Sequence, residues 1–263
     1  MKRKALFFDI DGTLLSDHKK ELPESAARVI AQARRAGHLV FINSGRARCL
    51  MQEVEAALPV DGYLCSCGTY LEIQGKKVLH HVIGRERRLE LQKSILAHDL
   101  DGILEGPEGC AVQSQVSRLE EMERVKELFI KSGVVHPWDW KKEAAEFDKF
   151  CVLADEKSDV DGFLRSLAPD MAYIDRGRGL YECVPAGYDK ATAMEFILKY
   201  FRIPREESYA FGDSANDLAM IQYAGHSVIM GQHDRILEPY ASFITKNVED
   251  DGIAFAFEKL KIV

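Results

Sequence analysis

Short apolar segments alternate with helix-like segments at both ends of this chain. KALFFDI at residues 4–10 and HLVFINS at residues 38–44 have the apolar, β-branched and aromatic composition of buried strands. Between them, PESAARVIAQARRAG at residues 23–37 has apolar residues at helical spacing, a proline near its start and a glycine at its end. The alternation returns near the carboxyl end, where SYAFGD at residues 208–213 precedes another helix-like segment. Near-continuous apolar strands separated by helices predict an α/β fold with a parallel sheet that helices cover on both faces.

This rhythm changes in the middle of the chain. GYLCSCGTYLEIQGKKVLHHVI at residues 62–83 contains a hairpin with its turn at residues 74–76, and irregularly ordered helix-like and strand-like segments follow. We therefore expect a separate α+β domain inserted into the first one. The expected limits are residues 1–83 and 187–263 for the core domain and residues 84–186 for the insertion.

Charge and hydropathy argue against two classes of partner. The chain has 263 residues, of which 46% are hydrophobic and 29% charged, and its formal net charge is −7. Proteins that bind nucleic acid through its phosphates carry a basic excess or a basic stripe, and this sequence has neither. No apolar run approaches the roughly 20 residues that a membrane-spanning helix needs. The six cysteines are scattered and lack the usual zinc-site spacing, so we expect free thiols and a cytoplasmic protein.

Two carboxylates stand at the end of the first strand-like segment. Asp9 and Asp11 lie in the sequence DIDGT, one residue apart. Because alternate residues of a strand point the same way, we expect both side chains beyond the carboxyl edge of the sheet, where ligands bind in open α/β folds. Two close carboxylates resist joint ionisation unless a cation lies between them. Mg²⁺, which prefers oxygen ligands, is the commonest candidate.

A second acidic cluster follows a later strand-like segment. FGDSANDLAM contains Asp213, Asn216 and Asp217, and a helix-like segment begins there. If both strands belong to one sheet, this cluster brings two more carboxylates to the same edge. Serine and aspartate also cap helices, which accounts for one acid at this position but not for acids at two strand ends.

Two further segments supply groups that can bind an anion. FINSGR ends a strand-like segment, and the Ser44 hydroxyl and the backbone N–H groups beside Gly45 can hold an anion at the start of a helix. Arg46 follows directly and is a candidate substrate contact. Lys190 begins a helix-like segment after PAGYD. Each signal is weak alone, because serine-glycine pairs are common in turns and most lysines are solvated.

Together these four segments resemble the haloacid dehalogenase superfamily, and within it the Cof-like phosphatases with a type IIB cap. The Asp-x-Asp-Gly-Thr motif matches DIDGT, the strand-end hydroxyl matches Ser44, the lysine matches Lys190, and Gly-Asp-x-x-x-Asp matches GDSAND. The order, the spacing and the inserted domain agree over essentially the whole chain. The resemblance implies a Rossmann-like, doubly wound parallel sheet as the core, with an inserted α+β cap domain.

The resemblance also implies a role for each motif residue. Asp9 would be the nucleophile that forms an aspartyl-phosphate, and Asp11 the general acid–base. Mg²⁺ would be held by Asp9, the backbone carbonyl of Asp11, and Asp213. Asp217 would support the metal or the lysine. The groups that would bind the phosphoryl oxygens are those of Ser44, Gly45, Lys190 and Asn216.

Two positions depart from the family pattern, and the cap is harder to interpret. Ser44 replaces the more usual threonine but keeps the hydroxyl, and Cys67-Gly68 stands where the family often has Asn-Gly. The cap loop DRGRG, at residues 175–179, is a basic candidate contact, although surface ion pairing explains its arginines as well. His80 and His81 are adjacent on an expected strand, so they point to opposite sides and do not suggest a shared metal site.

We predict a Mg²⁺-dependent phosphatase for small phosphorylated metabolites, either a monomer or a homodimer. Sugar phosphates are the first expectation, with pyridoxal phosphate and flavin mononucleotide as other candidates. Two alternatives remain: a phosphomutase that shares the motifs, and a non-catalytic sensor of phosphorylated metabolites. Release of inorganic phosphate without an isomeric product separates the phosphatase from both.

Overall fold

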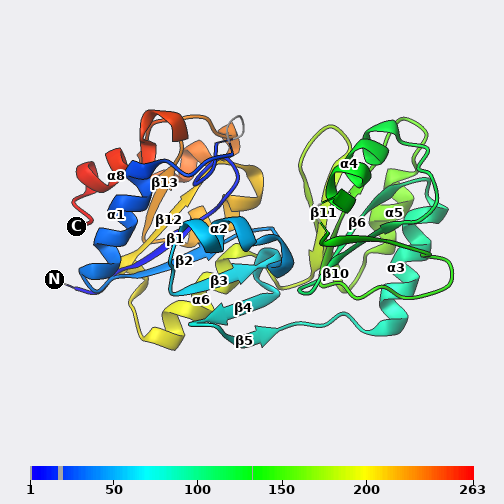
Figure 1. The fold of residues 1–263 in the computed structure, drawn as a ribbon, viewed down its shortest axis with the longest axis horizontal. Helices are drawn as coiled ribbons and strands as arrows, with labels where there is room; N and C mark the ends of the chain where they lie inside the picture. The colour runs from blue at the N-terminus through cyan, green and yellow to red at the C-terminus, as the bar shows by residue number, and fades with distance from the viewer. Residues whose placement is uncertain (1, 17–19, 132) are drawn as a thin grey trace. The chain divides into compact units, whose positions relative to one another are not determined.

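The computed structural model describes residues 2–16, 20–131 and 133–263. The chain divides into two compact units, which Figure 1 colours by residue number. Unit 1 comprises Met1–Gly45, Gln52–Val78 and Asp189–Val263, and unit 2 comprises Arg46–Met51 and Leu79–Tyr188. The domain limits expected from the sequence, 1–83 with 187–263 and 84–186, stay a prediction.

A mixed sheet forms the centre of unit 1. Over the described residues it has eight strands in the order β14-β13-β12-β1-β2-β3-β4-β5. The strands are β1 (Ala5–Phe8), β2 (Leu39–Asn43), β3 (Gly62–Cys65), β4 (Tyr70–Ile73), β5 (Lys76–His80), β12 (Ser208–Gly212), β13 (His226–Ile229) and β14 (Phe243–Ile244). β1 pairs in parallel with β2 on one side and β12 on the other, whereas β3 and β4 pair antiparallel. This arrangement confirms the predicted parallel core, with the hairpin added at one edge.

Consecutive phenylalanines of β1 point to opposite faces of this sheet, and each belongs to a group of rings that includes a phenylalanine of a helix. Phe7 of β1 stacks on Phe41 of β2, which contacts Phe201 of α6 (Lys190–Phe201). The next residue, Phe8, faces the other way and stacks on Phe211, and both rings contact Phe257 of α8 (Gly252–Leu260). These opposite contacts follow from the two-residue period of a strand and confirm the doubly wound core.

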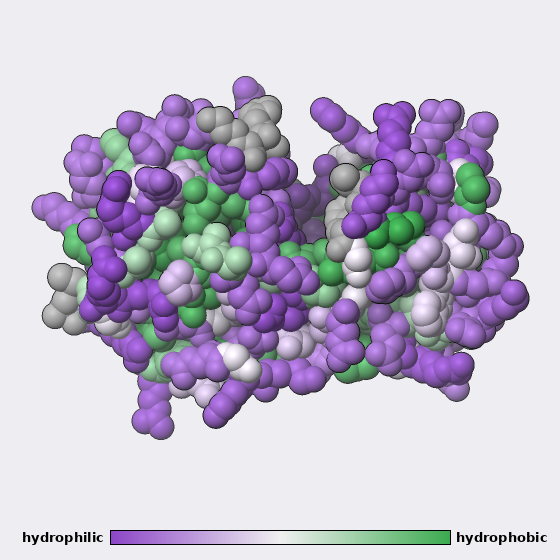
Figure 2. All heavy atoms as spheres, viewed as in Figure 1, coloured by the Kyte–Doolittle hydropathy of each residue, from purple (hydrophilic) through white to green (hydrophobic). Residues whose placement is uncertain are grey.

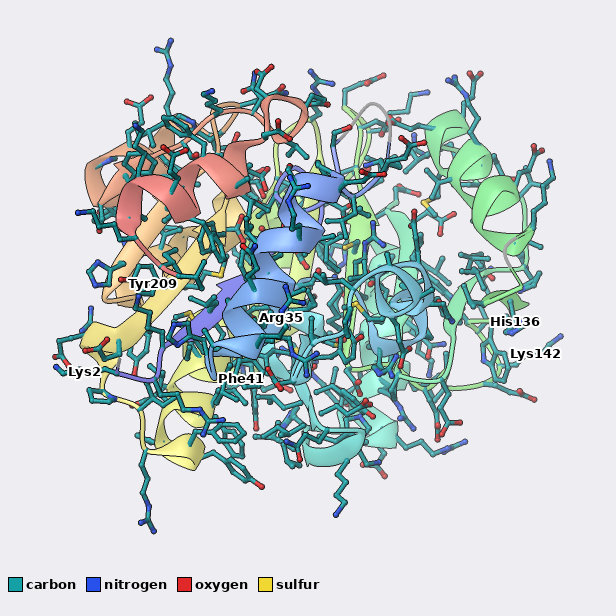
Figure 3. All side chains as sticks on the ribbon, turned by 60° about the vertical axis from the view of Figure 1, so that its left-hand side comes forward. Lys2, Arg35, Phe41, His136, Lys142 and Tyr209 are labelled. Atoms are coloured by element: carbon teal, nitrogen blue, oxygen red, sulfur yellow. The ribbon has the colours of Figure 1, made fainter. Side chains whose placement is uncertain are left out.

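The remaining helices extend the two layers. α1 (Glu24–Arg35) packs with α8, and α7 (Leu218–Tyr223) packs with α6 and against β12 and β13. In Figure 3, the labelled Arg35 ends α1 and is exposed, whereas Phe41 of β2 is fully buried. The core of unit 1 therefore lies between its sheet and the two helix layers.

Three predicted elements differ from the structure. β1 ends at Phe8, before the two aspartates. The segment ARCLMQEVEAAL at residues 47–58, which the sequence predicts as one helix, is split into a 3₁₀ turn, Arg48–Leu50, and α2 (Gln52–Ala57), because Ala47 and Cys49 are buried in an apolar cluster of unit 2. The segment DRILEPYA at residues 234–241, which the sequence predicts as a short helix, contains a 3₁₀ helix, Arg235–Tyr240, in which Pro239 leaves one position without an N–H donor.

Unit 2 is an α+β structure of its own. Over the described residues its sheet has six strands in the order β10-β11-β9-β6-β7-β8. The strands are β6 (Asp101–Glu105), β7 (Cys110–Gln113), β8 (Val135–Trp138), β9 (Lys149–Leu153), β10 (Met171–Asp175) and β11 (Leu180–Pro185). Helices α3 (Arg85–Ala97) and α5 (Val160–Ser166) share a core with one face of this sheet, and α4 (Glu120–Lys131) packs against β8.

The surface of both units is largely polar. Figure 2 shows hydrophilic side chains over most of the visible face of each unit. The labelled His136 and Lys142 of unit 2 in Figure 3 are exposed polar side chains of this kind. Within the described part of the chain, no helix combines the length and the apolar composition needed to cross a membrane.

Candidate active site

Three neighbouring parallel strands of unit 1 end at one edge of the sheet. Asp9 follows β1, Ser44 follows β2 and Asp213 follows β12. Because β1 lies between β2 and β12 and runs parallel to both, these residues emerge on the same edge. This is the edge at which open α/β sheets bind ligands.

Asp9 is buried at the centre of this edge. Its backbone N–H donates to the carbonyl of Phe211 at 3.0 Å, which extends the pairing of β1 with β12 by one residue. Its carboxylate Oδ1 accepts a hydrogen bond from Lys190 Nζ at 2.6 Å, and only 4% of the residue is exposed. The backbone thus fixes the position of Asp9 and the lysine fixes the orientation of its carboxylate.

Asp11 lies in a turn and not on the strand, which corrects the expectation from strand geometry. The turn is closed by a hydrogen bond of 2.8 Å from the Gly12 N–H to the Leu15 carbonyl. The Asp11 side chain is 42% exposed, and Lys20 Nζ is 3.5 Å from its Oδ1. Asp11 is therefore the more solvated of the two aspartates and does not belong to the buried acidic cluster.

The Gly-Thr pair after Asp11 positions Asp213. Gly12 has φ +82°, and a Cβ atom at this position would lie 2.3 Å from Asp213 Oδ2. Only glycine allows this turn to come so close to the carboxylate. The next hydroxyl, Thr13 Oγ1, donates to Asp213 Oδ1 at 2.8 Å. Thr13 is the last residue of the DIDGT motif, and the motif alone assigns no role to its side chain.

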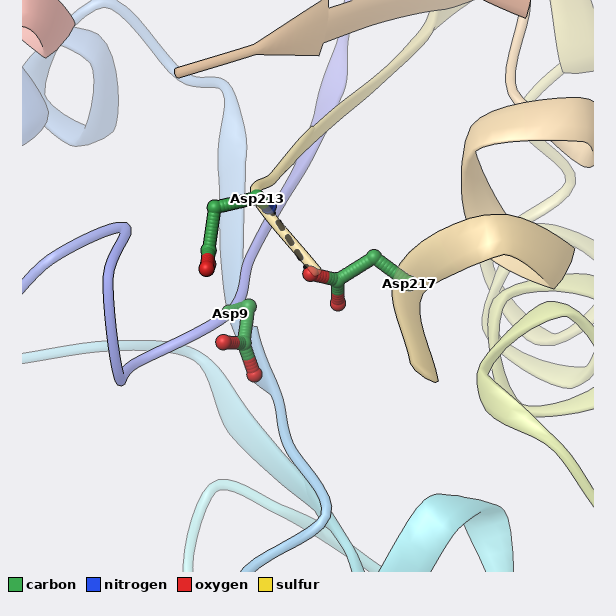
Figure 4. A group of neighbouring side chains, drawn as sticks. All are labelled: Asp9, Asp213 and Asp217. Carbon is green, nitrogen blue, oxygen red and sulfur yellow. Dashed lines mark hydrogen bonds between the residues drawn. The ribbon is translucent and has the colours of Figure 1, made fainter. Parts of the chain in front are cut away.

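Asp217 connects the two acidic motifs through hydrogen bonds. Its Oδ2 accepts from the backbone N–H groups of Asp213 and Ser214 at 2.9 and 3.0 Å. Its Oδ1 accepts from Lys190 Nζ at 2.6 Å. Figure 4 shows Asp9, Asp213 and Asp217 together, with the bond between Asp217 and the Asp213 N–H dashed. Both oxygens of Asp217 are thus already in use.

Lys190 is the buried cation of the site. Its Nζ contacts Asp9 and Asp217 and lies 3.5 Å from Asn216 Oδ1. Helix α6 starts at Lys190 behind a capping box, in which the Asp189 carboxylate accepts from the Thr192 N–H at 2.7 Å. The capped helix start and the two carboxylates hold Lys190 in place.

Asn43 also supports this lysine and was not predicted from the sequence. Its Nδ2 donates to the Lys190 backbone carbonyl at 2.9 Å, which joins the end of β2 to the start of α6. Asn43 directly precedes Ser44 in the chain. Its place in FINSGR, at the end of an apolar strand, was the available signal.

The phosphate-loop candidates divide between the two units. Ser44 is buried, its N–H donates to the Leu64 carbonyl at 2.8 Å, and its carbonyl accepts from the Cys67 N–H at 3.2 Å. Gly45 is the last residue of this stretch in unit 1, and Arg46 belongs to unit 2. The structure therefore places Ser44 on the same sheet edge as Asp9, but it does not group Arg46 with the acidic cluster.

Burial and mutual repulsion shape the protonation of the cluster. Burial raises the pKa of Asp9 to about 7; the Lys190 charge opposes this rise and the Asp217 charge adds to it. Burial likewise raises the pKa of Asp213 to about 9, with further contributions from Asp217 and Asp9. Burial disfavours the charge of Lys190, but the two carboxylates outweigh this effect and raise the pKa of Lys190. The carboxylates therefore lack sufficient positive charge for full ionisation.

The acidic cluster has the donor set of a site for a hard dication. One oxygen from each of Asp9, Asp213 and Asp217 lies within 4.8 Å of the others. Asp217 is committed to Lys190 and the backbone, whereas among the described residues Oδ2 of Asp9 and Oδ2 of Asp213 accept no hydrogen bond. Mg²⁺ binds carboxylate oxygens, and it would supply the positive charge that these two oxygens do not receive from Lys190. The pair therefore fits Mg²⁺.

Comparisons with known proteins agree with this geometry. A family model described as haloacid dehalogenase-like hydrolase matches residues 6–257. "Putative phosphatase YkrA" of Bacillus subtilis (strain 168) is 29% identical over 265 residues, which cover 100% of both chains. "5-amino-6-(5-phospho-D-ribitylamino)uracil phosphatase YitU" of the same organism is 24% identical over 257 residues, covering 94% of this chain and 93% of its own.

A solved structure has the same fold. The HAD subclass IIB sugar phosphatase BT4131 superposes with a TM-score of 0.86 at 24% identity. The match covers 99% of this chain and 100% of that chain. Both the sheet of unit 1 and the inserted α+β unit therefore have a counterpart of known structure.

Proposed function

Because the chain belongs to the family of haloacid dehalogenase-like hydrolases and is a phosphatase, we propose that it hydrolyses small phosphorylated metabolites through an aspartyl-phosphate on Asp9. The observation that carries this proposal is the buried Asp9 carboxylate, with Oδ1 held by Lys190 and Oδ2 accepting no hydrogen bond among the described residues. A fixed carboxylate with one available oxygen is what nucleophilic attack on phosphorus requires.

Asp9, Asp213 and the backbone carbonyl of Asp11 would hold Mg²⁺. When bound, the cation supplies the positive charge that lets an anionic carboxylate approach an anionic phosphate. Asp217 would remain with Lys190 and the two backbone N–H groups, as its hydrogen bonds indicate. Its role in the proposal is therefore to fix Lys190 and the Asp213 backbone, not to bind the metal.

Nucleophilic attack, proton transfer and phosphate binding are assigned to side chains and backbone groups of the chain itself. Asp9 attacks phosphorus while Asp11 donates a proton to the leaving oxygen, and Asp11 then takes a proton from the water that cleaves the aspartyl-phosphate. The exposed position of Asp11 suits this exchange with leaving group and water. Ser44, Gly45, Lys190 and Asn216 would bind the phosphoryl oxygens, where negative charge must be matched in the transition state.

The substrate class rests on the resemblance and on the relatives. We propose sugar phosphates first, because BT4131 is described as a sugar phosphatase, and phosphorylated cofactors or their precursors second, because YitU is named for such a substrate. Arg46 is the proposed substrate contact outside the acidic cluster. The cytoplasmic location and the monomeric or homodimeric state belong to the same proposal.

The test is a phosphate-release assay on a panel of hexose phosphates, pyridoxal phosphate and flavin mononucleotide. We expect release with Mg²⁺, loss on chelation and recovery when Mg²⁺ is added back. Asp9→Asn should keep the fold but lose turnover. Hydrolysis that survives exhaustive chelation, or an Asp9→Asn variant with full activity, contradicts the proposal. An isomeric sugar phosphate as the main product would favour the phosphomutase.

A further inference from the structure

The segment Arg46–Met51 departs from its sequence neighbours and packs with unit 2. The chain leaves unit 1 after Gly45 and returns to it at Gln52. Ala47 and Cys49 are buried in an apolar cluster with Cys110 and Val112 of β7 and with residues at the start of α4. The segment Arg46–Met51 therefore packs on the sheet of unit 2 through apolar contacts.

Two thiols face each other in this cluster. The Sγ atoms of Cys49 and Cys110 are 3.6 Å apart, and Cys49 Sγ also donates to the Gly106 carbonyl at 3.2 Å. The residues are 61 positions apart in the chain, and both are buried, with 7% and 3% exposure. A disulfide has a sulfur–sulfur distance of about 2.0 Å, so closure requires a shift of only about 1.6 Å shared between two side chains.

The hydrogen bond between the thiols makes their roles unequal. Either sulfur can be the donor in this contact; with Cys110 as the donor, the contact lowers the pKa of Cys49, although burial opposes this. The same hydrogen bond, with burial, raises the pKa of Cys110. Since the thiolate is the nucleophilic form, this donor arrangement would make Cys49 the first of the two to react with an oxidant, and Cys110, whose sulfur is 3.6 Å away, is placed to attack it afterwards.

We propose that Cys49 and Cys110 are a modification site: they form a reversible disulfide on exposure to hydrogen peroxide, and this disulfide slows turnover. The Cys49 thiolate attacks one peroxide oxygen, the O–O bond breaks, and the departing hydroxide takes up a proton to become water. The Cys110 sulfur then attacks the sulfenic sulfur of Cys49, the S–O bond breaks, and a second water leaves with the thiol proton. Two thiols thus lose two electrons to one peroxide.

The disulfide would change how the chain is connected. The segment Arg46–Met51 is joined by peptide bonds to unit 1 at both ends, and Cys110 begins β7 of unit 2. Both cysteines belong to unit 2, so the new bond would lock the segment Arg46–Met51, which follows Ser44 and Gly45 in the chain, onto β7. Any step of turnover that needs this segment to move away from β7 would stop until a thiol reductant restores it. This effect on turnover rests on the proposed function, whereas the disulfide itself does not.

Peptide mapping of peroxide-treated protein without reduction tests the chemistry. We expect a cross-linked peptide pair containing Cys49 and Cys110, lighter than the two thiol peptides by two hydrogen atoms, which dithiothreitol separates. Cys49→Ser and Cys110→Ser should each prevent this pair, and Cys49→Ala serves where the serine variant folds poorly. Cys151→Ser, a control in the same sheet, should still form it. Treated protein without the Cys49–Cys110 pair overturns the proposed site.

Turnover measured on the same samples tests the consequence. Treated wild-type protein should lose most of its phosphate release and regain it with dithiothreitol, while Cys49→Ser and Cys110→Ser keep their activity. If the cross-link forms and turnover is unchanged, the claimed control of activity is wrong. If the serine variants lose activity to peroxide as the wild type does, another cysteine is responsible. Failure of the phosphatase proposal itself would appear as no activity before treatment, with the peptide map unaffected.

Discussion

At the scale of single residues, Lys190 balances charges that would otherwise be buried without a partner. Its ammonium group contacts Asp9 and Asp217 at 2.6 Å each, and its side chain is fully buried. Removing one partner of a buried ion pair leaves an uncompensated charge, which costs more than the pair contributes.

Lys190→Met should lower the free energy of unfolding by about 3–5 kcal/mol and abolish turnover, because Asp9 and Asp217 lose their shared counterion. Chemical denaturation measures the first effect. Lys199→Met is the matched control on the same helix, since this lysine is 73% exposed and its pair with Glu195 contributes little. Equal stability losses in the two variants would contradict the assigned role of Lys190.

Gly12 gives a second prediction at the same scale. Gly12→Ala places a Cβ atom 2.3 Å from Asp213 Oδ2 in addition to the cost of φ +82°, so it should weaken Mg²⁺ binding. Gly75→Ala is the control: Gly75 has φ +73° but nothing within 4 Å of an added Cβ. Both variants should lose about 1–2 kcal/mol of stability from the left-handed backbone. Titration calorimetry measures the Mg²⁺ affinity of both variants. Equal affinities would show that the close approach of Gly12 to Asp213 has no part in metal binding.

At the scale of elements, the start of α6 positions the lysine. The capping box of Asp189 and Thr192 fixes the first turn, and Gly68 lets a neighbouring loop reach the Asp189 carbonyl, which an added Cβ would meet at 2.5 Å. The orientation of Lys190 therefore depends on a local capping motif as well as on its ion pairs.

Asp189→Ala should lower stability by about 1 kcal/mol, as the loss of a helix cap does, and should also weaken binding of inorganic phosphate. The control is Asp159→Ala, which removes a cap from α5 of unit 2, where the Asp159 carboxylate accepts from the Gly162 N–H. It should lose similar stability and leave phosphate binding unchanged. A parallel weakening in both variants would mean that the α6 cap has no special connection to the site.

The helices, strands and turns differ in how well the sequence alone predicted them. The alternation of apolar strands with helices predicted a parallel sheet covered on both faces, and the family resemblance implied that Asp9, Lys190, Asp213 and Asp217 meet. Strand geometry misplaced Asp11, because β1 ends at Phe8 and a turn begins after it. The contact of Gly12 with Asp213 joins residues about 200 positions apart, and no local pattern encodes it. The grouping of Arg46–Met51 with unit 2 also depends on contacts between residues that are distant in the sequence, so no local pattern encodes it either.

At the scale of the whole molecule, the site links protonation, metal binding and stability. The folded protein raises the pKa of Asp9 to about 7 and of Asp213 to about 9, from 3.8 in both cases. The folded state therefore binds protons that the unfolded chain has released, so these groups make the metal-free protein less stable as pH rises from about 4 to about 9.

Mg²⁺ competes with those protons, so the increase in melting temperature that it produces should be larger at about pH 9 than at about pH 6. Thermal denaturation with and without Mg²⁺ at several pH values measures this. Asp213→Asn should lose most of the Mg²⁺ effect at every pH. A Mg²⁺ effect that is independent of pH would show that the cation does not displace protons from this pair.

The measurement closest to the central claim is the identity of the residue that receives the phosphoryl group. Asp11→Asn should be mixed with Mg²⁺ and p-nitrophenyl phosphate, whose leaving group needs little acid assistance, and then quenched in acid and mapped by mass spectrometry. The account predicts one phosphoryl group on Asp9, because the water that would remove it is no longer activated. A phosphoryl group on any other residue, or full turnover by Asp9→Asn without one, would contradict it.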